Sequence, residues 1–207
     1  MDWKTFLRNK RHLAELILTL ILLIIIMISF SQFLQFIEMR EGILLQDPIL
    51  NLFNPIDLTW LTFTVIYLSV ILFVSAVIKK PYLLMISFQT YSLMIIFRAI
   101  AMYLAPLNPP SELILLNDPF VQFFGQGDIL TKDLFFSGHT ATMFLLFLLA
   151  ENKKLKMVFL VFTFAVGACV LLQHVHYSID VFAAPFFSYC SFRFIMVFHK
   201  INLEMKG

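Results

Sequence analysis

The apolar run LAELILTLILLIIIMISFSQFLQFI, at residues 13–37, contains a single charged side chain, that of Glu15. About 20 consecutive apolar residues are enough to cross the hydrocarbon core of a bilayer. Further runs of the same kind cover residues 58–78, 82–105, 137–150, 155–173 and 177–198. The sequence therefore predicts an all-α fold, a bundle of six transmembrane helices.

The composition supports this fold class. Hydrophobic residues make up 60% of the 207 residues, and the mean hydropathy is +0.89, whereas soluble domains contain about 45–50% apolar residues. The net charge of +2 is too small and too scattered to indicate nucleic-acid binding. Both cysteines, Cys169 and Cys190, lie inside apolar runs and carry no redox signal. We expect one polytopic membrane domain over residues 1–207, without a cleavable signal peptide.

The fourth run, residues 137–150, is shorter than the others. At 1.5 Å per residue its helix reaches about 21 Å, less than the thickness of a hydrocarbon core. We expect this helix to start at Ser137, below the outer surface of the membrane, and to continue through Glu151.

The charges between the runs predict their orientation. Most of the 15 basic residues precede the first run or follow the second, fourth and sixth: Lys4, Arg8, Lys10, Arg11, Lys79, Lys80, Lys153, Lys154, Lys156, Lys200 and Lys206. The positive-inside rule makes these segments, and both termini, cytoplasmic. Residues 106–136, between the third and fourth runs, are then exoplasmic. We interpret this Pro- and Gly-containing loop as a lid on the membrane surface.

A first polar motif, Phe136-Ser137-Gly138-His139-Thr140, opens the fourth run. Ser is a favoured helix N-cap, Gly lets a ligand approach the backbone, and a helix N-terminus attracts phosphate oxygens. His139 would face that site. Taken alone, the motif is equally compatible with a plain helix cap that carries an interfacial histidine.

A second polar motif, HVHYSID at residues 174–180, opens the sixth run. His176 and Asp180 are four residues apart and share one helix face. The Asp180 carboxylate can accept a hydrogen bond from one ring nitrogen of His176, which leaves the other nitrogen able to attack a substrate. A structural ion pair that caps the helix is the alternative. His174 is expected to point elsewhere, in a structural or a substrate-contact role.

Three imidazoles and a carboxylate also suit zinc chemically. Neither a His-x3-His spacing nor a Cys ligand supports such a site, and the Ser-Gly-His turn would then have no purpose. We expect no metal and no cofactor.

At these motifs the chain resembles the type 2 phosphatidic acid phosphatase superfamily of six-span lipid phosphatases and phosphotransferases, and most closely its sphingomyelin synthase branch. DLFFSGHT at residues 133–140 is similar to that branch's Asp-x2-Phe/Tyr-Ser-Gly-His-Thr, and HYSIDV at 176–181 to its His-Tyr-Thr-x-Asp-Val. RAIAMY at 98–103, at the exoplasmic end of the third run, is a third similarity. The resemblance covers roughly residues 80–200.

The chain also departs from these patterns. Thr131 and Lys132 stand where the synthases have Cys-Gly, and Val175 replaces an acidic residue between two histidines. These differences argue against specificity for a choline headgroup. Cys169 and Val170 stand where the phosphatases have Ser-Arg, which argues against an ordinary phosphatase.

The resemblance implies a mechanism. His176 attacks the phosphorus of a headgroup phosphodiester and forms a phosphohistidine, while Asp180 orients it. His139 acts as general acid and then as general base. The amides of residues 137–139 would hold the non-bridging oxygens. Further candidates for contacts to phosphate or substrate are Ser137, Gly138, Arg98, Lys132, Tyr103, His174, Tyr177, Asp133 and Glu112.

Several of these candidates have a structural alternative. Arg98 would otherwise snorkel toward the headgroups, and Lys132 would be solvated. Glu112 would be a surface carboxylate. Asp133 would cap the fourth run.

The favoured function is a lipid phosphotransferase that moves a phospholipid headgroup phosphate ester to the hydroxyl of a lipid of the ceramide or diacylglycerol type. With water as acceptor, the same residues would form a phosphatase or a phospholipase C-type hydrolase. A non-catalytic membrane transporter or scaffold is the alternative from another class. The expected partners are a phospholipid donor and a lipid hydroxyl acceptor, or water. The compact size suggests a bacterial inner-membrane protein whose active site faces the periplasm.

Overall fold

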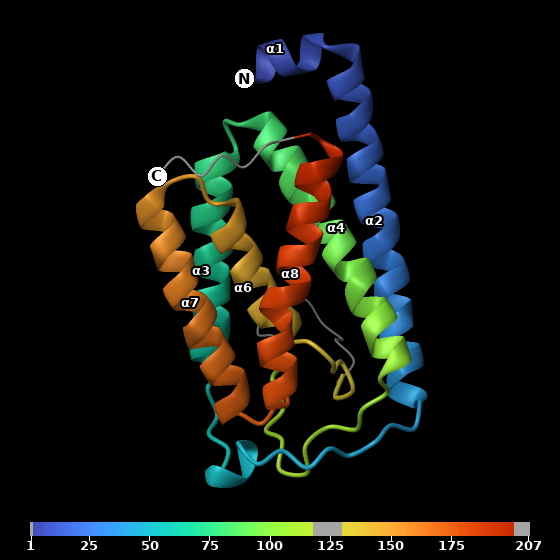
Figure 1. Cartoon of the computed structure of the whole chain (residues 1–207), viewed down its shortest axis with the longest axis vertical. Helices are drawn as coiled ribbons and strands as arrows, with labels where there is room; N and C mark the ends of the chain where they lie inside the picture. The colour runs from blue at the N-terminus through green and yellow to red at the C-terminus, as the bar shows by residue number, and fades with distance from the viewer. Residues whose placement is uncertain (1, 118–129, 201–207) are drawn as a thin grey trace.

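The computed structural model describes residues 2–117 and 130–200. Within them the chain forms α-helices and no strand (Figure 1). The helices are α1 (Trp3–Arg8), α2 (Lys10–Met39), α3 (Thr59–Val77), α4 (Pro81–Leu104), α6 (Gly138–Leu149), α7 (Lys153–Leu172) and α8 (Ser178–Phe198), with the short 3₁₀ helix η1 (Leu50–Leu52).

Five of these helices, α2, α3, α4, α7 and α8, are long and apolar enough to cross a membrane. Their ends lie within a few residues of those predicted from the sequence. The five apolar helices indicate an integral membrane protein.

The fourth predicted span is a shorter apolar helix. Ser137 caps α6, which ends at Leu149 rather than continuing through Glu151. Its 12 residues span about 18 Å. The described helices therefore give five full-length candidates for membrane spans and one shorter helix, and the count of six spans stays a prediction.

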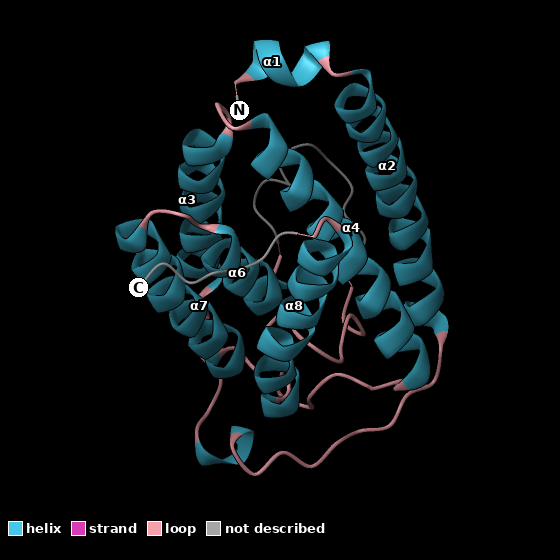
Figure 2. Ribbon diagram, turned by 45° about the horizontal axis from the view of Figure 1, so that its top comes forward, coloured by secondary structure: helices cyan, strands magenta, loops and turns pink. Residues whose placement is uncertain are grey.

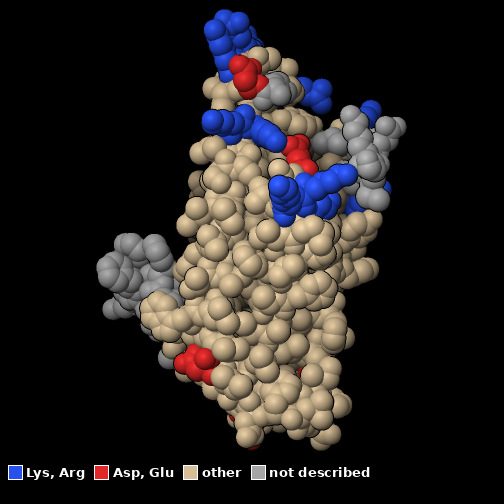
Figure 3. Space-filling view, turned by 90° about the vertical axis from the view of Figure 1, so that its left-hand side faces the viewer, with Lys and Arg blue, Asp and Glu red and all other residues tan. Residues whose placement is uncertain are grey.

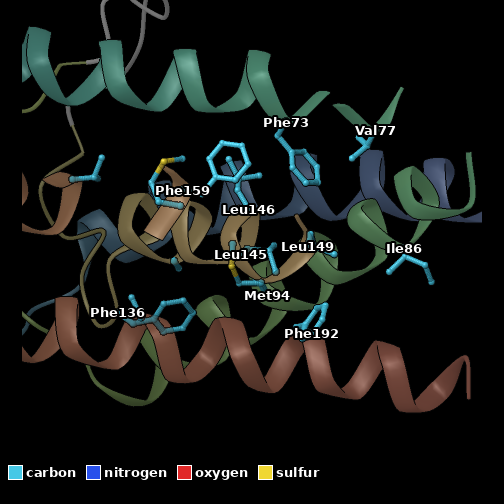
Figure 4. Close-up of a cluster of buried hydrophobic side chains, with 14 of the residues drawn as sticks. Phe73, Val77, Ile86, Met94, Phe136, Leu145, Leu146, Leu149, Phe159 and Phe192 are labelled. Atoms are coloured by element: carbon cyan, nitrogen blue, oxygen red, sulfur yellow. The ribbon is translucent and has the colours of Figure 1, made fainter. Parts of the chain in front are cut away.

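The short helix α6 lies at the centre of the bundle, where it packs against α3, α4, α7 and α8 (Figures 1 and 2). The main core forms around it, with Leu145, Leu146 and Leu149 facing Phe159 of α7 and Phe192 of α8 (Figure 4). Helix α2, by contrast, lies at the edge and packs mainly on α4. The core therefore holds in place the helix that carries the first polar motif.

One end of the bundle carries most of the basic side chains, and we refer to it as the basic end. It holds α1 and the turns between α3 and α4 and between α6 and α7. Trp3 Nε1 donates to the carbonyl of Ile78 (2.7 Å), and Lys80 pairs with Glu151. In Figure 3 the lysine and arginine side chains gather at this end, above a broad zone without charged atoms. Such a zone suits the hydrocarbon core of a bilayer.

The opposite end, which we call the motif end, joins the starts of α6 and α8 to the loops after α2 and α4. Backbone hydrogen bonds link Ile43 to both Pro106 and Asn108. Residues 118–129, part of the predicted lid, lie outside the described residues. The lid itself therefore stays a prediction.

Candidate active site

The structure brings the two polar motifs together at the motif end. The ring centroids of His139, in the first turn of α6, and His176, just before α8, lie 6.3 Å apart with the rings at 62° to each other. The Ser137 amide donates to the Asp180 carbonyl (3.0 Å) and so ties the start of α6 to the start of α8. The two imidazoles therefore lie in edge-to-face contact, so that one phosphoryl group beside them would lie within reach of both rings.

Asp180 lies behind His176, as the four-residue spacing predicts. Its Oδ2 is 3.3 Å from Nδ1 of His176, and it also accepts a hydrogen bond from the Tyr177 amide (3.2 Å). Both side chains are buried, with exposed fractions of 2% for His176 and 0% for Asp180. The carboxylate thus holds the helix terminus and the imidazole at once, and Nε2 of His176 is the ring nitrogen turned away from it.

The His139 ring contacts two other rings. Besides His176, it meets Phe63 of α3 edge to face, with centroids 5.8 Å apart. Phe63 itself is buried. Packing from a third helix therefore restricts the orientation of His139.

Arg98 of α4 lies against the first residue of α6. A Cβ atom added to Gly138 would stand 2.3 Å from Nη1 of Arg98, so only glycine admits the guanidinium at this position. Arg98 is 6% exposed, and its Nη2 pairs with Oδ1 of Asp133 at 2.7 Å. The snorkelling alternative is wrong, because the guanidinium is buried beside the positive end of a helix, where phosphate oxygens bind well. Asp133 is an ion-pair partner and not the helix cap.

The backbone before Ser137 is strained. Phe135 and Phe136 have φ angles of 62° and 47°, values that bulky residues rarely adopt. The buried Phe136 ring stacks on Phe187 of α8 with centroids 4.5 Å apart, which stabilises the turn. Strain of this kind often accompanies a functional site, and here it aims Ser137 and Gly138 at α8 and α4.

Other candidates from the sequence lie away from the two histidines. Lys132 donates through Nζ to the carbonyl of Arg40 (2.6 Å), and its amide donates to Glu38 (2.9 Å). It therefore closes the end of α2 instead of being solvated. Tyr103 is 56% exposed and stacks under the guanidinium of Arg40, 4.9 Å from its ring centroid.

His174 supports the turn after α7. Its φ is 56°. The His174 amide donates to the Leu171 carbonyl (2.9 Å) and the Val175 amide donates to the Val170 carbonyl (3.0 Å), which is the hydrogen-bond pattern of a Schellman motif. The buried ring packs edge to face on Phe53. Within the described contacts, His174 has the structural role that its spacing from His176 allowed.

Tyr177 links the loop after α2 to the loop after α4. Its hydroxyl donates to the Asn108 carbonyl (2.8 Å) and accepts from the Leu45 amide (3.3 Å). Together with His174 and the exposed Glu112, it lines a cavity of about 550 Å³ at the motif end. This cavity is lined by other residues than His139 and His176.

The structure also reveals an anchoring residue that the sequence did not suggest. Asp47 accepts hydrogen bonds from the amides of Ser178 (2.6 Å), Ile49 (2.9 Å) and Leu50 (3.4 Å). Burial alone would raise its pKa, but these hydrogen bonds outweigh burial, and the net pKa lies below the usual value. No local signal identifies Asp47, because its partner in α8 is 131 residues away.

A second such residue is Gln173, which directly precedes His174. Its fully buried side chain accepts from the Leu58 amide (3.1 Å) and donates to Thr59 Oγ1 (2.8 Å). A polar amide at the end of an apolar run was the available signal. Among residues 2–117 and 130–200, no three His, Cys, Asp or Glu side chains gather as a metal site requires.

A comparison with curated proteins finds no match to this chain. A comparison with protein families matches residues 132–199 to the family model described as PAP2 superfamily C-terminal, where PAP2 denotes type 2 phosphatidic acid phosphatase. The match covers about a third of the chain and includes both polar motifs. It does not reach the level of the sphingomyelin synthase branch, which stays a prediction. The match supports the PAP2 superfamily, with lipid phosphatase or phosphotransferase chemistry, for the part of the chain that holds His139, His176 and Asp180.

Proposed function

We propose that this protein is a membrane lipid phosphotransferase that moves a phospholipid headgroup phosphate ester to a lipid hydroxyl through a phosphohistidine. The observation that carries the proposal is the 6.3 Å between the rings of His139 and His176, with Asp180 against Nδ1 of the latter. Arg98 and the amide of Gly138 lie beside this pair and supply positive charge for phosphate oxygens.

In the first half-reaction, Nε2 of His176 attacks the phosphorus. A nitrogen–phosphorus bond forms while the bond from phosphorus to the oxygen of the departing lipid breaks. Protonated His139 gives its proton to that alkoxide, which leaves as an alcohol. Asp180 stabilises the positive charge that develops on the ring of His176.

In the second half-reaction, neutral His139 removes the proton of the acceptor hydroxyl. The acceptor oxygen attacks phosphorus, the bond to His176 breaks, and the headgroup phosphate ester leaves on the acceptor lipid. Of the amides in the turn, that of Ser137 is engaged with the Asp180 carbonyl. The role in binding non-bridging oxygens therefore falls to the amides of Gly138 and His139, with Arg98 beside Gly138.

The choice of a lipid acceptor over water rests on burial. His176 exposes 2% of its side chain, so bulk water has little access to a phosphohistidine formed there. A hydrolase that uses the same residues is the second candidate. The departing and accepting lipids are of the diacylglycerol or ceramide type, and the site faces the exoplasmic side.

The test uses purified protein in liposomes that contain labelled phospholipid, with and without ceramide or diacylglycerol. We expect His176→Ala to abolish turnover, and His139→Ala to reduce it by about 10²–10⁴-fold because one proton transfer is lost. Mass spectrometry of the lipid products separates transfer from hydrolysis. A phosphohistidine is acid-labile, so the protein is quenched without acid, and an increase in its mass then reports the intermediate. Wild-type turnover in His176→Ala would refute the proposal.

Asp180→Asn distinguishes an orienting carboxylate from a plain helix cap. An orienting role predicts a fall in turnover of about 10²–10⁴-fold, since Asn holds the ring without its charge. The matched control is Asp57→Asn, which changes an aspartate outside the site at the start of α3. If Asp180→Asn lowers the melting temperature in detergent but leaves turnover per folded protein unchanged, the carboxylate is only structural.

A further inference from the structure

A cavity at the basic end lies far from the candidate active site along the bundle. Near the motif end α2 and α4 pack closely through Phe30, Ile37, Ile95 and Met102. Toward the basic end the two helices diverge, as Figures 1 and 2 show. A cavity of about 950 Å³ opens there between α2, α4 and the end of α8, at the upper end of the volumes typical of ligand sites.

The polar wall of this cavity joins three helices. His199 after α8 contacts Gln89 Oε1 through Nε2 (2.6 Å) and the Tyr82 hydroxyl through Nδ1 (3.2 Å), both on α4. Gln89 Nε2 in turn donates to Thr19 (3.0 Å) and to Glu15 (3.4 Å) on α2. Burial lowers the pKa of His199, so the neutral ring that satisfies both of its contacts is favoured. The network links the three helices along one wall of the cavity.

The mouth of the cavity is positively charged. Arg11 in the first turn of α2 and Lys200 after α8 line it, and in the described part of the chain neither forms an ion pair with a carboxylate. Glu15 is the acidic residue of the lining, and Gln89 Nε2 donates to its carboxylate (3.4 Å). With Arg11 and Lys200 against Glu15, the charged side chains of the lining carry a net positive charge, which attracts an anionic group.

The rest of the lining is an apolar groove. Leu18, Leu22 and Ile26 follow one another every four residues along α2 and form a stripe of about 12 Å that runs from the mouth toward the middle of the bundle. Ile96 of α4 and Phe198 of α8 face the same cavity. Leu18, Leu22 and Phe198 remain 56%, 46% and 70% exposed, so the groove opens to the surrounding acyl chains.

We propose that this cavity between α2, α4 and the end of α8 binds one anionic phospholipid from the leaflet that faces the basic end. Its phosphate lies between Arg11 and Lys200, and one acyl chain follows Leu18, Leu22 and Ile26. The charge of the mouth selects an anionic headgroup over a zwitterionic one, since each basic side chain near a membrane surface attracts anionic lipid. The bound lipid fills the gap between α2 and the rest of the bundle.

The experiment is native mass spectrometry of the full chain released from nanodiscs of phosphatidylglycerol and phosphatidylcholine. We expect one retained phosphatidylglycerol on the wild type and at least a tenfold lower retained fraction on the double variant Arg11→Gln, Lys200→Gln. The matched control, Lys153→Gln with Lys154→Gln, removes the same charge at the same end but outside the cavity, and should retain the lipid.

A second pair of variants tests the groove. Leu22→Trp fills it and should displace the lipid, whereas Ile24→Trp, on an exposed face of the same helix, should not. Equal retention by the charge variant and its control, or equal retention of phosphatidylcholine, would overturn the proposal. His176→Ala should retain the lipid fully, so the result does not depend on whether the proposed phosphotransfer is correct.

Discussion

At the scale of single residues, the contact between Gly138 and Arg98 is the most sensitive in the site. The guanidinium occupies the space that any side chain at position 138 would need. Arg98 is held there by Asp133 and lies over the ring of Phe30, 5.7 Å from its centroid. The absence of a Cβ atom at Gly138 therefore allows the buried guanidinium of Arg98 to lie at this position.

Gly138→Ala should fold but lose most of its turnover. The new methyl group meets the flexible end of Arg98, which can move away, so the cost falls on phosphate binding and not on the fold. Turnover in liposomes and the melting temperature in detergent measure the two effects. Gly167→Ala is the control for the contact with Arg98, because the three atoms nearest to its added methyl group belong to Val181 (3.1 Å) and Thr140 (3.7 and 3.8 Å) and none to Arg98. If Gly138→Ala keeps full turnover, Arg98 has no part in catalysis.

At the scale of secondary-structure elements, the start of α8 depends on a distant loop. Asp47 accepts from the first amide of α8, at Ser178, and from two amides around η1. These contacts anchor the loop between α2 and α3 beneath the helix that carries Asp180. The geometry of the candidate site therefore depends on a carboxylate outside both polar motifs.

The lowered pKa of Asp47 makes this anchor pH-dependent. Its contribution to stability is complete above the unfolded value of about 3.9 and is lost as the pH falls through the lower folded value. Asp47→Asn should therefore melt at a lower temperature than the wild type at pH 7, and the difference should shrink below about pH 4. Melting temperatures between pH 3 and pH 7 test this. Glu41→Gln, an exposed carboxylate in the same loop, should show no such trend; a gap that is constant with pH would contradict the anchor.

At the scale of the whole molecule, the helices alternate between the two ends of the bundle. The turns from α3 to α4 and from α6 to α7 lie at the basic end, and the loops after α2 and α4 lie at the motif end. This alternation fits six crossings only if α6 counts as one of them. Neighbouring helices bury α6 on several sides, which compensates for its short length.

Asn117→Cys tests the orientation. In a background with Cys169→Ala and Cys190→Ala, the new thiol in the loop after α4 should react with an impermeant reagent in intact cells. Lys154→Cys, at the basic end, should react only after lysis. The reverse pattern would place the candidate site in the cytoplasm and would overturn the assigned orientation.

The sequence by itself determined the five long apolar helices, because hydrophobic length and spacing act locally along the chain. It also predicted the pairing of His176 with Asp180, although His176 lies just before α8, so the capping turn at Tyr177 and not a shared helix face brings the two side chains together. Ser137 was predictable as a cap because capping also acts locally along the chain.

Only the tertiary structure decided which partners the other polar residues find. Lys132 closes α2, Asp47 anchors α8, and Arg98 lies on Gly138. Each of these outcomes depends on packing between segments that lie far apart in the chain. Such contacts leave no periodic trace in the sequence, because the free energy that selects them comes from the packed bundle and not from neighbouring residues.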